Sequence, residues 1–226
     1  MITPELIAKC ARYVQLKLAH EPAGHDWFHV ERVWKMGKRL QATEGGDLFL
    51  VELAALLHNL GDHNFGEFNE EKGMLALFGM MDILEIEEAD KEQLLNIVTD
   101  SKYKGDETTR PRTLEGKIVQ DANWLDVLGA IGIARTFAAG GFVGRPIFDP
   151  DVPVRPSLSK QVYQRKKREG TSINSFYEKA FRLPERLNTE TAKRIAEARL
   201  DYINSFLAQF MKEWEGADWE EILRVA

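Results

Sequence analysis

The sequence contains only one cysteine, Cys10, so no intrachain disulfide can form, and the composition shows no sign of an oxidising compartment. A long apolar run is also missing. The N-terminal stretch MITPELIAKCARYVQLKLAH has neither the uninterrupted apolar segment nor the small-residue cleavage site of a secretion signal. We therefore expect a cytoplasmic protein without a membrane segment.

Basic residues are fewer than acidic ones: 30 Lys and Arg stand against 36 Asp and Glu, which gives a formal net charge of -6. Broad binding to nucleic acid or to an anionic membrane needs a large field that attracts phosphate, so the charge argues against both partners. A small anionic molecule in a locally positive pocket is compatible with this charge. With 226 residues and 44% hydrophobic content, the chain can bury one full core, which predicts a single domain.

Strand-type alternation is scarce, whereas apolar residues recur every three or four positions, and this pattern predicts an all-α fold. The segment LFLVELAALLHNLG at 48–61 is apolar on almost all sides, which is typical of a helix buried in the centre of a domain. Helices are expected from Thr3 to about 20 and at about 26–45, 48–58, 70–84, 90–101, 113–128, 129–139, 172–182 and 189–214.

The longest break between predicted helices lies at roughly 140–170 and contains four prolines and the basic run RKKR at 165–168. A loop of this length inside a compact domain is usually functional or mobile. The basic run is either a solvated surface or, if the loop folds over a pocket, a positive rim for a phosphate. We therefore divide the domain into a core of about 1–140, a loop at 141–170 and C-terminal helices at 171–226.

Three polar clusters interrupt the apolar helices, where an unpaired ionisable group would cost several kcal/mol. They are HDWFH at 25–29, HNLGDH at 58–63 and DANWLD at 121–126. Imidazoles and carboxylates that converge from separate helices are the usual ligands of a divalent metal ion. Spacing alone does not decide the matter, because a buried histidine more often binds a core carbonyl than a metal.

The clusters belong to longer segments, GHDWFHVERV at 24–33, LAALLHNLGDH at 53–63 and EGKIVQDANWLDVLGAIGIAR at 115–135, that together resemble the HD superfamily. The likeness extends to TSINSFYEKAF and TETAKRIAEAR near the C-terminus, so it covers nearly the whole chain. It is strongest to small bacterial single-domain HD hydrolases, which are predicted phosphohydrolases. The resemblance implies an HD-type helical bundle with a divalent ion, whose metal ligands at the matching positions are His29, His58, Asn59 and Asp121.

The activity that the resemblance implies is metal-dependent hydrolysis of a small phosphorylated, nucleotide-like molecule. The ion, which the sequence does not identify among Mn, Mg, Zn, Fe and Ni, would polarise a phosphate oxygen and lower the pKa of a bound water. Asp62 is the candidate catalytic acid or base, although it could simply organise the turn after a helix. Arg32 and His25 are the candidate substrate-binding residues. Arg32 could equally pair with a carboxylate such as Glu31 or Asp126.

The chain departs from the family pattern at several polar positions. Family members have Asp at the position of Asn59, and related sequences have His, Asp and His at the positions of Asp100, Asn123 and Ser175. Neutral Asn59 leaves Asp121 as the only carboxylate of the implied ligand set, so we expect weaker metal binding unless Asp100 or Asp62 restores the charge. Two alternatives follow: a metal-poor pseudoenzyme or ligand-binding module on the HD scaffold, and a helical interaction protein with polar core hydrogen bonds.

Overall fold

The computed structural model describes residues 3–19, 26–60, 70–159 and 169–218, and all regular structure in these ranges is helical. The all-α prediction is therefore confirmed. The α-helices are α1 (Pro4–Lys17), α2 (Trp27–Glu44), α3 (Leu48–Leu57), α4 (Glu70–Ile83), α5 (Glu88–Asp100), α6 (Leu114–Leu125), α7 (Gly129–Phe142), α9 (Asn174–Glu178) and α10 (Glu190–Trp214). Short 3-10 turns are η1 (Gly105–Glu107), η2 (Ala180–Arg182) and η3 (Pro184–Arg186).

Helix starts follow local capping chemistry. The side chains of Thr3, Asp26, Asp47, Thr113 and Thr189 each accept a backbone N–H in the first turn of the helix that follows. The predicted first helix ends at residue 17, earlier than the expected 20, and the predicted 113–128 helix ends at residue 125. A bend of 72° then separates α6 from α7.

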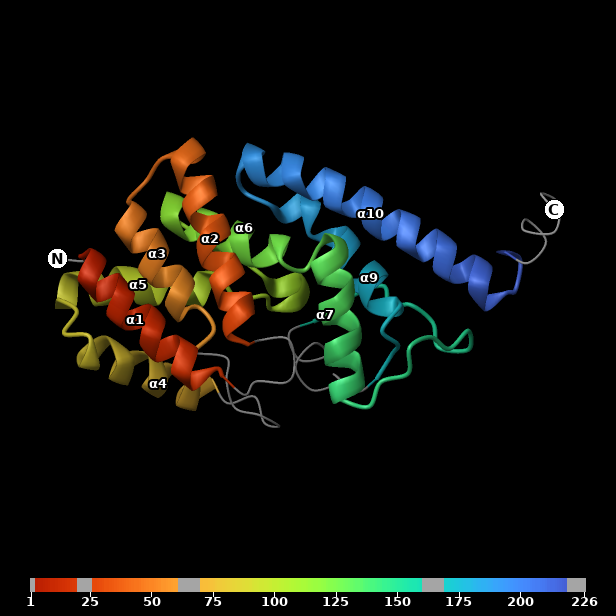
Figure 1. Ribbon diagram of the computed structural model, residues 1–226, viewed down its shortest axis with the longest axis horizontal. Coiled ribbons are helices and arrows are strands. Elements are labelled where there is room, and N and C mark those ends of the chain that lie inside the picture. The colour runs from red at the N-terminus through yellow and green to blue at the C-terminus, as the bar shows by residue number, and fades with distance from the viewer. Residues whose placement is uncertain (1–2, 20–25, 61–69, 160–168, 219–226) are drawn as a thin grey trace.

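Helix α3 lies at the centre of the fold, and its residues from Leu50 to Leu57 are all buried. It packs against α1, α2, α5 and α6, as its apolar composition predicts. Figure 1 shows α10 running along the upper side of the molecule past α7 and α9, while α1, α4 and α5 lie on the opposite, N-terminal side. The elements that carry the histidine and aspartate clusters therefore meet where α2, α3 and α6 pack together.

The described part of the long loop, up to residue 159, is tied to the C-terminal half of the fold. Arg155 donates from its backbone and guanidinium to buried Glu178, and Asn174 donates to the Val152 carbonyl. Arg182 donates to the Arg155 carbonyl. These bonds hold residues 152–155 against α9, whereas the basic run at 165–168 lies outside the described residues.

In the described ranges, no single helix is both long and apolar enough to cross a membrane. The α6 and α7 pair reaches the required length and composition only when the two bent helices are taken together.

Candidate functional site

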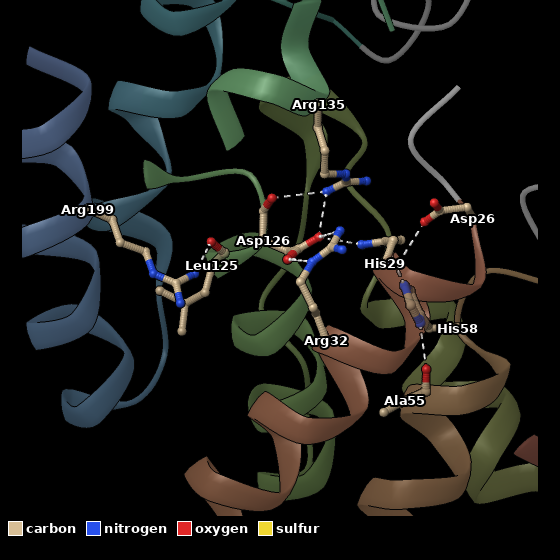
Figure 2. A network of polar contacts seen from close by, with 9 residues as sticks. All are labelled: Asp26, His29, Arg32, Ala55, His58, Leu125, Asp126, Arg135 and Arg199. Atoms are coloured by element: carbon tan, nitrogen blue, oxygen red, sulfur yellow. Dashed lines mark hydrogen bonds and ion pairs between the residues drawn. The ribbon is translucent and has the colours of Figure 1, made fainter. Parts of the chain in front are cut away.

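His29 lies in the first turn of α2, where the Asp26 side chain caps the helix by accepting the His29 backbone N–H at 2.9 Å. Its side chain is 1% exposed and points toward the end of α6. The ring atom Nδ1 lies 2.7 Å from Oδ2 of Asp126 (Figure 2). An ionised carboxylate can only accept, so Nδ1 carries the hydrogen and Nε2 is the basic nitrogen.

His58 follows the last residue of α3 and is 2% exposed. Its Nδ1 lies 2.7 Å from the Ala55 carbonyl oxygen, one turn earlier in the same helix. A carbonyl also only accepts, so Nδ1 of His58 carries the hydrogen and Nε2 is again the basic nitrogen.

The two basic nitrogens face each other: Nε2 of His58 lies 3.3 Å from Nε2 of His29, with the rings at 75°. Two imidazoles that bind one ion at about 2.0–2.1 Å in a tetrahedral arrangement have their nitrogens about 3.3 Å apart. With both rings neutral, a cation or a shared proton between them would satisfy both lone pairs. The pair therefore has the geometry of two metal ligands from separate helices.

His29 is held in its neutral, ligand-competent form. Burial lowers its pKa well below the usual value, and the positive charges of Arg135, His58, Arg32 and Lys179 lower it further. Asp126 favours the charged ring, but burial and these cations outweigh it. A metal ion can therefore bind Nε2 without displacing a proton at neutral pH.

Asp126 connects this pair to two guanidinium groups. Its carboxylate, 7% exposed, accepts from Nε and Nη2 of Arg32 at 2.7 and 2.9 Å and lies 3.2 Å from Nη1 of Arg135. Figure 2 shows Arg135 reaching down from α7 and Arg199 approaching from α10, where it donates to the Leu125 carbonyl. Of the two roles predicted for Arg32, the structure displays the pairing with Asp126.

Asp121 faces a different direction. Its fully buried carboxylate accepts from the backbone and side-chain nitrogens of Asn188, both at 2.9 Å, and from the backbone and hydroxyl of Thr189, both at 2.8 Å. Burial raises the pKa of Asp121, and these hydrogen bonds oppose the rise. These bonds tie the carboxylate to the start of α10, and its role as a metal ligand, which the resemblance implies, stays a prediction.

The remaining predicted residues are distributed as follows. Asn59 is buried beside His58 in the chain, and its role as ligand stays a prediction. Asp100, at the end of α5, lies 3.7 Å from the Arg112 guanidinium. His25 and Asp62 lie outside the described residues, so their predicted roles are not tested.

The fit to a metal ion is therefore partial. His29 and His58 have the spacing of two ligands, but the described part of the chain contains no group of three His, Cys, Asp or Glu side chains arranged to hold an ion. The sequence predicts Asp126 only as a possible partner for Arg32, although its place at the end of the DANWLD cluster marks it as polar in an apolar helix.

Comparison with protein families finds a match to the HD domain over residues 27–128, the span from the start of α2 to just beyond α6. The uncharacterized protein YpgQ of Bacillus subtilis is 32% identical over 215 residues, which is 92% of this chain and 93% of that protein.

Solved structures resemble the chain over nearly its whole length. A Lactobacillus plantarum protein has a TM-score of 0.86 and 34% identity over 96% of this chain and 100% of its own. An HD-superfamily hydrolase from Bacillus thuringiensis has a TM-score of 0.70 and 41% identity over 93% and 97%. Bacillus subtilis YpgQ in complex with ADP has a TM-score of 0.72 and 28% identity over 94% and 97%.

Proposed function

Because this chain belongs to the HD superfamily, we propose that it is a phosphohydrolase whose site is built around the His29–His58 pair. The observation that supports this most directly is the 3.3 Å separation of the two Nε2 atoms, while each Nδ1 donates its hydrogen to another acceptor. HD-superfamily hydrolases generally depend on a divalent metal ion, and this spacing suits one.

His29 and His58 would hold that ion, and we propose the Asn59 amide oxygen as a further ligand. When bound, a divalent ion supplies a Lewis acid for the phosphate oxygen and a water of lowered pKa. Asp126 has the role of a positioning residue, because its hydrogen bond to Nδ1 fixes the ring orientation of His29 and makes Nε2 more basic. Asp62 is kept as the proposed acid or base.

We propose a small phosphorylated, nucleotide-like molecule as the substrate. Support comes from the ADP complex of YpgQ, a relative that matches 92% of this chain. The cations near His29, which include Arg32, Arg135 and Lys179, favour an anionic ligand in a chain whose net charge is -6.

A second candidate is a ligand-binding module that binds the phosphorylated molecule without hydrolysing it. Two observations favour it: Asn59 is neutral, and the Asp121 carboxylate is engaged by Asn188 and Thr189 at the start of α10. Both reduce the negative charge available to a divalent ion near the histidines.

The two candidates differ in metal content. We would purify wild type, Asn59→Asp and the matched surface control Asn204→Asp without chelator, and measure bound metal and hydrolysis of p-nitrophenyl phosphate. Near-stoichiometric metal and hydrolysis in wild type support the phosphohydrolase. Metal in Asn59→Asp alone supports the binding module, and metal in none of the three proteins rejects a metal-dependent hydrolase.

A further inference from the structure

The end of α6 carries Asp126, so the position of this helix end decides where the carboxylate meets His29. The last four carbonyls of a helix have no partner within the helix, and their position depends on other contacts. The turn that follows supplies one of these, because the Leu128 amide donates to the Leu125 carbonyl at 3.1 Å. This bond lies within the turn itself. A contact from another helix is needed to fix the turn relative to the rest of the fold.

Two arginines from other helices supply such contacts. Arg199 of α10 donates from Nη1 to the Leu125 carbonyl, and Arg135 of α7 donates from Nη1 to the Asp126 carbonyl at 3.1 Å (Figure 2). Consecutive carbonyls at the end of α6 are thus bound by two cations, the charge that the C-terminal end of a helix favours. Arg135 also contacts the Asp126 carboxylate, whereas Arg199 reaches the backbone just before it.

The fold makes room for the Arg199 side chain. Gly129, at the start of α7, has φ of 71°, and a Cβ at this position would lie 3.1 Å from Cγ of Arg199. The backbone angle and the close approach both favour glycine here. Burial lowers the pKa of Arg199, and the negative charge of Asp126 opposes the shift. Because a guanidinium stays charged, burying it costs free energy that an apolar side chain would not cost, which indicates a role beyond packing.

A second contact also joins α10 to α6. Thr189, just before the first residue of α10, donates from its backbone and its hydroxyl to the Asp121 carboxylate, both at 2.8 Å. Further along α10, the side chains of Ile203 and Leu207 are buried in the core. Loss of the Arg199 guanidinium should therefore leave α10 in place and release the turn that carries Asp126.

We propose that Arg199 is a positioning residue: by binding the Leu125 carbonyl it fixes the backbone that carries Asp126, and Asp126 in turn orients His29. Arg32 and Arg135 hold the carboxylate group, while Arg199 holds the chain from which it extends. The inference rests on the proposed role of His29 in the site. It extends that site to α10, which lies beyond the span 27–128 that matches the HD domain.

The test measures how fast the Nδ1 hydrogen of His29 exchanges with water, by NMR of the metal-free full chain with isotope-labelled histidine. This hydrogen exchanges when its bond to Asp126 opens, so the rate reports that contact. His29→Gln identifies the signal by its loss. We expect exchange on the order of 10-fold faster in Arg199→Met, as the loss of one hydrogen bond from a charged donor predicts. Arg199→Lys, which keeps the charge and a donor, should recover part of the protection.

Three comparisons control this measurement. Nδ1 of His58 bonds to Ala55 within its own helix, so its exchange should change much less than that of His29 in Arg199→Met. Arg194→Met, which alters an exposed arginine of α10, should leave both hydrogens as in wild type. Gly105→Ala, a change in η1 that should lower stability, shows how far a general loss of stability accelerates exchange.

Wild-type exchange of the His29 hydrogen in Arg199→Met, or an acceleration no larger than in Gly105→Ala, would overturn the inference. If Arg199→Met does not fold, Gly129→Ala takes its place, because the new Cβ displaces the Arg199 side chain and keeps its charge. Folded Gly129→Ala with wild-type exchange would equally overturn it. The measurement needs neither metal nor substrate. Failure to hydrolyse any phosphoester therefore rejects the proposed hydrolase without deciding the role of Arg199.

Discussion

Replacing Asp126 by Asn should destabilise the fold by about 3 kcal/mol. The carboxylate is the shared counter-charge of Arg32 and Arg135 and accepts the Nδ1 hydrogen of His29. Removing one partner of a buried ion pair typically costs about 3–5 kcal/mol. We expect the lower value, because the side chains of Arg32 and Arg135 are 34% and 15% exposed and water screens the charges left behind.

Urea unfolding followed by circular dichroism would measure this change. The slope of the unfolding free energy against urea concentration shows whether wild type and variant expose similar surface when they unfold. A loss of 3 kcal/mol corresponds to a fall in Tm of about 6–12 °C for a chain of this size. Asp201→Asn, which alters an exposed carboxylate on α10, is the control and should stay within about 0.5 kcal/mol of wild type. A loss below about 1 kcal/mol for Asp126→Asn would refute the assignment of Asp126 as the shared counter-charge.

Further experiments test other parts of the structure. Burial raises the pKa of Cys10 to about 12, so at pH 8 a thiol reagent should label the chain only as urea unfolds it, and rapid labelling of folded protein would contradict this. Gly105→Ala should cost about 1–3 kcal/mol, because φ is 64° and the new Cβ would lie 2.0 Å from a backbone oxygen. Gly79→Ala, in an open position of α4, should be neutral or stabilising by up to about 1 kcal/mol in the same melting assay. Asp121→Asn should lower the free energy of unfolding by about 1–3 kcal/mol without weakening ADP binding. Loss of ADP binding by folded Asp121→Asn protein would contradict this and indicate that Asp121 belongs to the ligand site.

The parts of the fold that the sequence predicted are those with local causes. Capping by Thr3, Asp26 and Asp47 needs only the residues that follow each of them, so the helix starts could be predicted. The buried α3 could be predicted because it is apolar on nearly every side, whatever its neighbours are. The end of α6 was predicted too late, and the carbonyls at this end accept hydrogen bonds from Arg199 of α10 and Arg135 of α7, contacts that local sequence does not show.

Which of Asp121 and Asp126 contacts His29 depends on tertiary structure. Asp126 follows Asp121 by five positions, which places their side chains about 140° apart around a helix. Asp126 therefore contacts α2 and Asp121 contacts the start of α10. The spacing alone does not show which aspartate faces which helix. The resemblance names Asp121 as a metal ligand, which stays a prediction, and the structure shows that Asp126 is the carboxylate in contact with His29. Arg32 posed the same difficulty, since its pairing with Asp126 joins residues 94 positions apart.

The hydrogen bonds of Asp126 link the two kinds of ligand that this site could bind. By accepting the Nδ1 hydrogen of His29, the carboxylate keeps Nε2 basic and oriented toward His58, which favours a cation. By pairing with Arg32 and Arg135, it neutralises part of the charge that would attract a phosphate. Loss of this carboxylate would therefore weaken the site for a metal ion and strengthen its field for an anion. Neutral Asn59 shifts the balance in the same direction, which is why phosphate affinity in this chain need not follow metal affinity.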